Sequence, residues 1–292
     1  MASKRSSISD LLNAGLDRLR SPTADRPKTG DRRATVIAVA AQKGGVGKTT
    51  TVVNLGCALA ANHGKRVLIV DIDPQGHVTS SLRESVRPAE ATLSDVLLAN
   101  KPKDLMEAVA QSGLDNLSLT GPDKSLNDTE SLLSTRVGRE MILKGAMQTA
   151  RTHFDVILID CPPNLGNLTL NALVAADQVL IPCDMSILAF EGVADLIGAV
   201  ETVQMRLHPG LDVLGVLRTR LDRRNIQINQ AIEGALTTHY GERLFKAFIP
   251  VNSALAKAQA AGLSIFQFDK RSRGAEAYDA LAAEVLARLP VR

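Results

Sequence analysis

The sequence contains no tryptophan, only two tyrosines and six phenylalanines, and three cysteines among 292 residues. Its core must therefore be built from Ala, Val, Leu and Ile, which suits helices packed on a parallel sheet. The cysteines are spread singly, without a CxxC pair, which indicates a reducing cytoplasm and excludes a disulfide framework or a cysteine-ligated cluster. No apolar run approaches the roughly 20 residues that span a bilayer, so we expect neither a transmembrane helix nor a secretory signal.

The sequence also has little net charge, +3, because its 34 Lys and Arg are nearly balanced by 31 Asp and Glu. Residues 1–33 hold eight Lys/Arg against four Asp, which leaves the rest of the chain near −1. The protein is therefore not a globally basic nucleic-acid binder. Any contact with DNA must come from a local basic patch or from the N-terminal segment.

Residues 1–33 differ in character from the rest of the chain. Apolar side chains fall on one face of a short predicted helix, and residues 21–33 are rich in Pro, Thr, Asp and Lys, as in a flexible linker. We interpret this segment as a flexible basic extension with a possible short amphipathic helix. Its short apolar face lacks aromatic residues, which favours an accessory or partner-binding role over docking to a membrane.

From residue 34 onward, short apolar runs alternate with helical segments. The predicted strands are Thr35–Ala40, Val67–Asp71, Leu117–Thr120, Val156–Asp160, Val179–Pro182, Val213–Leu217 and Leu244–Ile249. The predicted helices are Thr50–Asn62, Ser131–Thr152, Asn167–Ala175, Phe190–Leu207, Gln227–Tyr240 and Ala275–Leu289. This alternation predicts an α/β fold over residues 34–292, a single domain with a mostly parallel twisted sheet covered by helices on both faces.

The first predicted strand leads into a glycine-rich loop and then a helix, which is the context of a phosphate-binding P-loop. The residues predicted to bind phosphate are Lys43, Gly44, Gly45, Val46, Gly47, Lys48, Thr49 and Thr50. Gln42 stands where the general GxxxxGK[ST] pattern has its first glycine, so the loop is a shortened KGGVGKT form. We expect Lys48 to reach the β- and γ-phosphates of a nucleotide and Thr49 to ligate Mg²⁺.

Two further apolar strands end in carboxylates. Asp71 and Asp73 follow one of them, and Asp160 ends the other. Ligands of open α/β sheets bind at the carboxyl ends of strands, where a carboxylate can orient an attacking water or hold a metal's hydration shell. We expect Asp160 to hold Mg²⁺. Taken alone, Asp71 and Asp73 also fit a turn-capping role. Cys161 is expected to be a packing residue beside the site.

The run KGGVGKTT resembles the deviant Walker A motif of the ParA/MinD superfamily. The runs Asp71–Gly76 (DIDPQG) and Asp160–Pro163 (DCPP) resemble the ParA branch of it. The resemblance extends over residues 34–289. It implies that Lys43 reaches across a homodimer to the partner's phosphates, that ATP lies between the two subunits, and that Asp73 is needed for hydrolysis. Lys43, Lys48 and Asp73 are thus the expected catalytic residues.

Two C-terminal segments also resemble the family. Ile249–Asn252 (IPVN) matches its IPxN segment, which implies that Pro250 and Asn252 lie near the adenine. Residues 269–276 match its DPRSRGAE stretch, with Lys270 in place of proline. Ala254 stands where chromosomal relatives often carry a second DNA-contacting arginine.

The resemblance implies a slow ATPase that is stimulated by a partner, either a ParB-like protein or another adaptor. The basic residues expected to bind DNA without sequence preference are Arg218, Arg220, Arg223, Arg224, Lys257, Lys270 and Arg271. The charge of these residues alone is equally consistent with a solvent-exposed face that binds nothing. The resemblance favours DNA binding, because Arg223 aligns with a DNA-contacting arginine of the family. We therefore expect a cytoplasmic, nucleoid-associated switch that partitions a chromosome or plasmid or positions a protein cluster. A MinD-like membrane-associated regulator is the alternative, although the last helix ends without a bulky apolar tail.

Overall fold

The computed structural model describes residues 33–82, 89–222 and 226–290, so the N-terminal segment and the predicted Arg223 and Arg224 lie outside the described residues. Contacts divide the chain into residues 1–32 and residues 33–292. The strands of the second unit are β1 (Thr35–Val39), β2 (Val67–Asp71), β3 (Val109–Gln111), β4 (Leu117–Thr120), β5 (Val156–Asp160), β6 (Gln178–Asp184), β7 (Asp212–Leu221) and β8 (Leu244–Pro250).

These strands form an eight-stranded sheet in the order β3-β4-β2-β5-β1-β6-β7-β8, and β3 alone runs antiparallel to its neighbour. The predicted single α/β domain with a mostly parallel sheet is confirmed. The strand β3 was missed, because its three residues at the edge of the sheet are too few to produce an apolar alternation.

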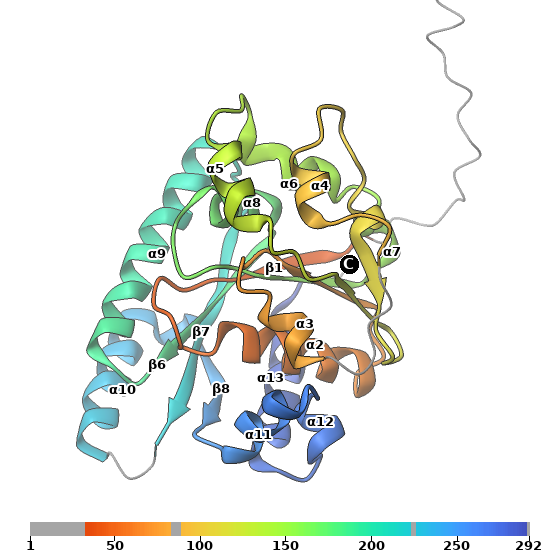
Figure 1. Ribbon diagram of the computed structural model, residues 1–292. Helices are drawn as coiled ribbons and strands as arrows, with labels where there is room; N and C mark the ends of the chain where they lie inside the picture. The colour runs from red at the N-terminus through yellow and green to blue at the C-terminus, as the bar shows by residue number, and fades with distance from the viewer. Residues whose placement is uncertain (1–32, 83–88, 223–225, 291–292) are drawn as a thin grey trace, which may run out of the picture. The chain divides into compact units, whose positions relative to one another are not determined.

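Helices cover both faces of the sheet (Figure 1). They are α2 (Lys48–Ala61), α3 (His77–Ser81), α4 (Leu93–Leu97), α5 (Leu126–Leu133), α6 (Ile142–Ala146), α7 (Ala150–His153), α8 (Asn167–Ala175), α9 (Ile187–Arg206), α10 (Ile226–Tyr240), α11 (Ser253–Ala261), α12 (Ile265–Phe268) and α13 (Arg273–Arg288). Short 3-10 helices span Leu105–Ala108, Arg139–Met141 and Gly241–Arg243.

Alternate residues of each strand face opposite layers, as the pleat of a strand requires. In β1, Val36 and Ala38 join the core beneath α4–α10, whereas Ile37 and Val39 join the core beneath α2, α3 and α11–α13. Because both faces are covered, the central strands are apolar at nearly every position. This arrangement leaves the carboxyl ends of β1, β2, β5 and β6 at one edge of the sheet.

The predicted helix Ser131–Thr152 is wrong. The structure has α5, a 3-10 helix, α6 and α7 over this stretch. Helix α5 already ends at Leu133, and Gly138, whose φ of 67° is left-handed, lies in the turn before the 3-10 helix. The apolar residues of 131–152 mimic the periodicity of one long helix because each short helix packs its own apolar side chains on the sheet.

Candidate nucleotide-binding site

The loop between β1 and α2 is shaped to surround an anion. Gly45 and Gly47 have φ values of 77° and 93°, a left-handed conformation that side chains disfavour. Helix α2 begins at Lys48, two residues earlier than predicted, and Gly47 supplies no side-chain cap. Its first turn also lacks an acidic residue. The N–H groups of this helix terminus are therefore left for a ligand, and the helix dipole favours a negative one.

Lys48 is the cation of this loop. The residue is 7% exposed, and its ammonium donates to the Lys43 carbonyl oxygen at 3.4 Å. Burial lowers the pKa of Lys48, and the nearby charge of Asp160 acts in the opposite direction. An ammonium that has lost water and has one long hydrogen bond is well suited to bind an anion.

Thr49 and Asp160 meet although they are 111 residues apart. The Thr49 hydroxyl donates to Asp160 Oδ2 at 2.7 Å. The other carboxylate oxygen, Oδ1, is buried and has no hydrogen-bond partner among the described residues. Burial and the charge of Asp71 raise the pKa of Asp160 well above its usual range. An unpaired buried oxygen beside a hydroxyl fits Mg²⁺, which would neutralise charge on bound phosphates.

Within the described part of the chain, no group of three or more His, Cys, Asp or Glu side chains is placed to hold a metal by itself. Mg²⁺ is commonly held by one or two carboxylates together with substrate phosphates. The pair Thr49 and Asp160 therefore suits a metal that arrives with a nucleotide. Cys161, next in the chain, is a buried free thiol whose pKa is raised by burial, which fits the expected packing role.

Asp71 and Asp73 differ in what their carboxylates contact. Asp71 lies beside Asp160 in the register of β2 and β5, and it accepts the N–H groups of Asp73 and Val78, both at 3.1 Å. Asp71 thus holds the loop that carries Asp73. Asp73 Oδ1 accepts the Gln75 N–H at 3.0 Å, and the residue is 7% exposed at the ligand edge of the sheet. Both carboxylates therefore cap a turn, and Asp71 in addition accepts the Val78 N–H.

The stability of the nucleotide-free protein should fall between pH 5 and pH 7. Burial raises the pKa of Asp71 to about 7 from its usual 3.8. Between these values the folded state holds a proton that the unfolded chain has released, so rising pH favours unfolding. We expect the free energy of unfolding in urea to drop over this interval, because burial raises the pKa of both neighbouring carboxyls, Asp71 and Asp160. The Asp71→Asn variant should show a flatter profile, and a parent protein that gains stability over the same interval would refute the assignment.

Lys43 is held by residues that the sequence did not single out. Its ammonium donates to Asp184 Oδ1 and Oδ2 at 3.2 and 3.0 Å and to the Ser186 hydroxyl at 2.9 Å. Asp184 ends β6, and Ser186 caps α9. Because β6 is the neighbour of β1, its carboxyl end lies beside the loop. The sequence signal that could have identified this contact is an Asp at the end of a predicted strand, two residues before a Ser that caps the next helix.

The predicted DNA-binding residues do not form one cluster. The Arg218 side chain is 11% exposed, pairs with Glu233, and donates to the Phe245 and Lys246 carbonyl oxygens. Arg220 instead contacts the phosphate-binding loop, where Nη1 donates to the Gly45 carbonyl oxygen at 3.1 Å. The remaining described members are exposed at α11 and before α13, namely Lys257, Lys270 and Arg271.

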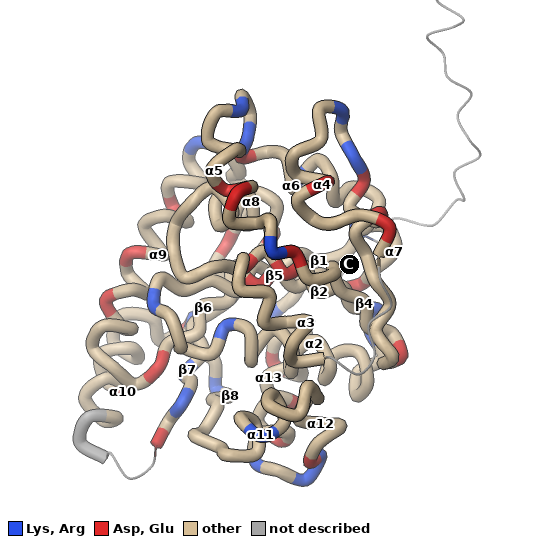
Figure 2. Tube along the Cα trace, viewed as in Figure 1, with Lys and Arg blue, Asp and Glu red and all other residues tan. Residues whose placement is uncertain are grey.

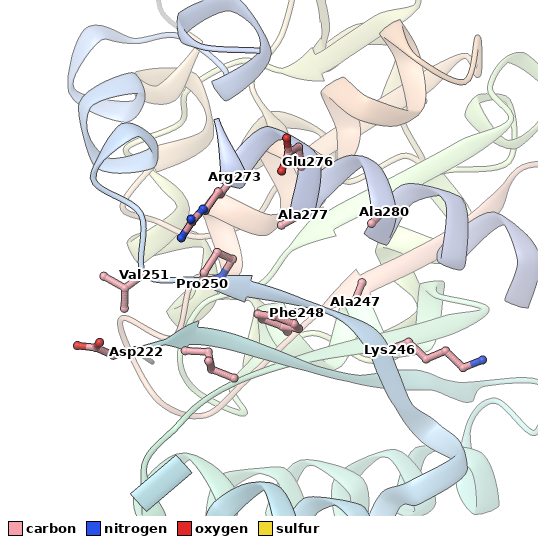
Figure 3. A pocket seen from close by; sticks show the side chains of 11 residues that line it. Asp222, Lys246, Ala247, Phe248, Pro250, Val251, Arg273, Glu276, Ala277 and Ala280 are labelled. Atoms are coloured by element: carbon pink, nitrogen blue, oxygen red, sulfur yellow. The ribbon is translucent and has the colours of Figure 1, made fainter. Parts of the chain in front are cut away.

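Pro250 ends β8 and Asn252 follows it, and β7 separates β8 from the strands next to the loop. Pro250 lines a groove of about 720 Å³ between β8 and α13, with Phe248 on the strand and Ala277 and Ala280 on the helix (Figure 3). No residue of the run 43–50 lines this groove. The Asn252 side-chain oxygen accepts the Ala254 N–H at 2.7 Å and so caps α11.

Comparison with known proteins agrees with this geometry. Residues 34–213 match a family model described as an AAA domain. The chain is 42% identical over 252 residues to the sporulation initiation inhibitor protein Soj of Bacillus subtilis, covering 86% of this chain and 98% of Soj. It is 38% identical over 255 residues to the chromosome partitioning protein ParA of Caulobacter vibrioides, covering 87% and 94%.

One solved structure is similar to this chain in both fold and sequence. The cobyrinic acid a,c-diamide synthase of Mycobacterium smegmatis, with bound ADP and magnesium, superposes with a TM-score of 0.72 at 35% identity. The match covers 87% of this chain and 94% of that one.

Proposed function

Since the chain belongs to the ParA family of P-loop ATPases, we propose that it is a switch that dimerises on ATP, binds DNA without sequence preference and positions a cargo. Hydrolysis of ATP releases the dimer. The observation that carries this proposal is the loop 43–50 with buried Lys48 at its end and the Thr49–Asp160 pair beside it. ATP and Mg²⁺ are the cofactors, and the reaction yields ADP and phosphate.

An exposed apolar surface beside the loop supports the homodimer. Ile187 and Leu188 are each 68% exposed, and they follow Ser186, which contacts Lys43. Leu165, which follows β5 on the other side of β1, is 44% exposed. Large apolar side chains that gather at the ligand edge of a sheet favour contact with another protein. A second copy placed here would bring its own phosphates within reach of Lys43, once Lys43 leaves Asp184.

Exposed basic residues on α11 and between α12 and α13 support DNA binding. Figure 2 shows Lys and Arg beside α11 and α12, and Lys257, Lys270 and Arg271 are exposed there. Lys257 lies three residues after Ala254 on α11, so the two positions share a helix face. Lys257 can therefore supply the positive charge that the arginine supplies in relatives, where this chain has Ala254. Exposed cations of this kind bind phosphates in a salt-dependent manner.

The adenine position remains part of the proposal. The groove with Pro250 also includes Leu221 and Asp222, which directly follow Arg220 on β7. Arg220 contacts the loop, so the groove begins next to the expected phosphate site. We propose that the base rests near Pro250 and Asn252, on the side of the loop toward β8.

The site of action is proposed to be the nucleoid in the cytoplasm, with a ParB-like or other adaptor that stimulates hydrolysis. Among the described residues, no helix is long and apolar enough to cross a membrane. Residues 1–33 are proposed to be an accessory segment for such an adaptor. Their eight basic residues against four acidic ones also provide weak attraction to nucleic acid.

DNA retention should depend on Arg223 and Arg224, which directly follow Asp222 at the end of β7. We expect Arg223→Glu/Arg224→Glu to bind random duplex DNA at least tenfold more weakly with Mg-ATP. The slope of log K against log salt should fall by about 2, because two phosphate contacts are lost. The control is Lys124→Glu/Arg206→Glu, which reverses two exposed charges elsewhere.

Equal binding of the variant at every salt concentration would remove this pair from the DNA surface. In a parallel arm, the parent protein is sedimented with anionic lipid vesicles in the presence of Mg-ATP. Sedimentation with vesicles and no retention on DNA would replace the nucleoid proposal with the membrane-associated alternative.

A further inference from the structure

The end of β7 contacts the phosphate-binding loop through two consecutive side chains. The Thr219 hydroxyl donates to the Val46 carbonyl oxygen at 2.7 Å, and Arg220 Nη1 donates to the Gly45 carbonyl oxygen at 3.1 Å. Thr219 is 2% exposed, so its hydrogen bond is shielded from water. Two neighbouring carbonyls of the loop are thus fixed by one strand that is distant in sequence.

Fixing these carbonyls also fixes the N–H groups that follow them. In a trans peptide unit, the C=O of one residue and the N–H of the next point in opposite directions, and both units here are trans. The contacts on Gly45 and Val46 therefore direct the N–H groups of Val46 and Gly47 away from β7. Successive N–H groups that converge with left-handed glycines between them form an anion-binding concavity.

The backbone of Arg220 is adapted to this contact. Its φ is 51°, a left-handed value that only Asn116 shares among the non-glycine residues of the described chain. Thr219 pairs with Asp184 on β6 and Leu221 pairs with Pro250 on β8, and the register between β7 and β8 shifts between Arg218 and Leu221. Pairing on both sides holds Arg220 in a disfavoured conformation, as is typical of functional positions.

We propose that Thr219 and Arg220 are positioning residues, which orient the Val46 and Gly47 N–H groups toward the phosphates of a bound nucleotide. The proposal rests on the proposed function, in that the loop must bind a nucleoside di- or triphosphate. It takes Arg220 out of the DNA-binding group and assigns it to the nucleotide site.

The test compares the affinity of full-length variants for Mg-ADP by calorimetric titration, with thermal midpoints measured without nucleotide. Thr219→Val keeps the shape of the side chain and removes the hydroxyl, whereas Thr219→Ser keeps the hydroxyl. Arg220→Gly removes the guanidinium and accommodates the positive φ. Arg206→Gln removes an exposed charge at the end of α9 and serves as the control.

We expect Thr219→Val and Arg220→Gly to bind Mg-ADP about tenfold more weakly, the fold-change that corresponds to one hydrogen bond of ordinary strength. Thr219→Ser and Arg206→Gln should stay within twofold of the parent. Rescue by serine distinguishes positioning from packing, and Arg220→Gly decides the question if Thr219→Val does not fold.

Parent affinity in both Thr219→Val and Arg220→Gly would overturn the proposal and leave the proposed function intact. Loss of DNA retention in Arg220→Gly with unchanged Mg-ADP affinity would return Arg220 to the DNA surface. A parent protein that binds no Mg-ADP would overturn the proposed function and this inference together.

Discussion

Lys48→Ala is expected to abolish ATP binding, lowering affinity at least about 100-fold, or about 3 kcal/mol. Lys48 begins α2 and is 7% exposed, and the loop holds its ammonium away from water. A phosphate would supply the charged hydrogen bonds that the ammonium lacks in the nucleotide-free protein. Alanine removes that contact and leaves the phosphate charge to the loop N–H groups alone.

The measurement is a nucleotide titration of parent, Lys48→Ala and the exposed-site control Lys124→Ala. Loss of binding must not come from unfolding, and the structure predicts that it does not. Because burial lowers the pKa of Lys48, the buried ammonium is costly without an anion. Nucleotide-free Lys48→Ala should therefore unfold at the temperature of the parent or above. Parent-like ATP affinity in this variant would refute the phosphate site.

Asp73→Ala should slow ATP hydrolysis at least about 100-fold while ATP binding is kept, since groups that orient or deprotonate an attacking water contribute on that scale. Asp73 lies at the ligand edge of the sheet in a loop that Asp71 holds through the Asp73 and Val78 N–H groups. Removing the carboxylate leaves Lys48, Thr49 and Asp160 in place.

A variant that binds ATP and does not hydrolyse it should accumulate as the ATP-bound dimer. Phosphate release under steady-state conditions and light scattering after ATP addition report the two effects. Glu201→Ala, on the exposed side of α9, is the control. Turnover at the parent rate in Asp73→Ala would assign water activation to another residue, and loss of ATP binding would make Asp73 a structural residue.

Local sequence predicted the elements whose pattern is local. The buried strands β2, β4 and β5 have the predicted bounds because each is a short apolar run between turn residues. The loop 43–50 was recognised because its glycines, Lys48 and Thr49 all fall within one run of eight residues. The predicted helix 131–152 was wrong because the chain turns between Leu133 and the left-handed Gly138.

The contacts that organise the site join residues far apart in sequence. Lys43 meets Asp184 across 141 positions, and Arg220 meets Gly45 across 175. Composition grouped Arg218 and Arg220 as neighbouring cations, whereas Arg218 pairs with Glu233 and Arg220 contacts the loop. The order of the strands and the left-handed backbone of Arg220 determine these contacts, and neither produces a local sequence pattern.

We propose that ATP joins two copies of this chain face to face at the loop. Gly44 offers a direct test, because the position is exposed and a Cβ added there meets nothing within 4 Å in the chain itself. We therefore expect Gly44→Val to fold and bind ATP as a monomer. Light scattering should show the parent doubling in mass with Mg-ATP and Gly44→Val remaining single. A parent that stays monomeric with saturating Mg-ATP, or a Gly44→Val variant that doubles in mass as readily, would contradict an ATP-bound dimer joined at this loop.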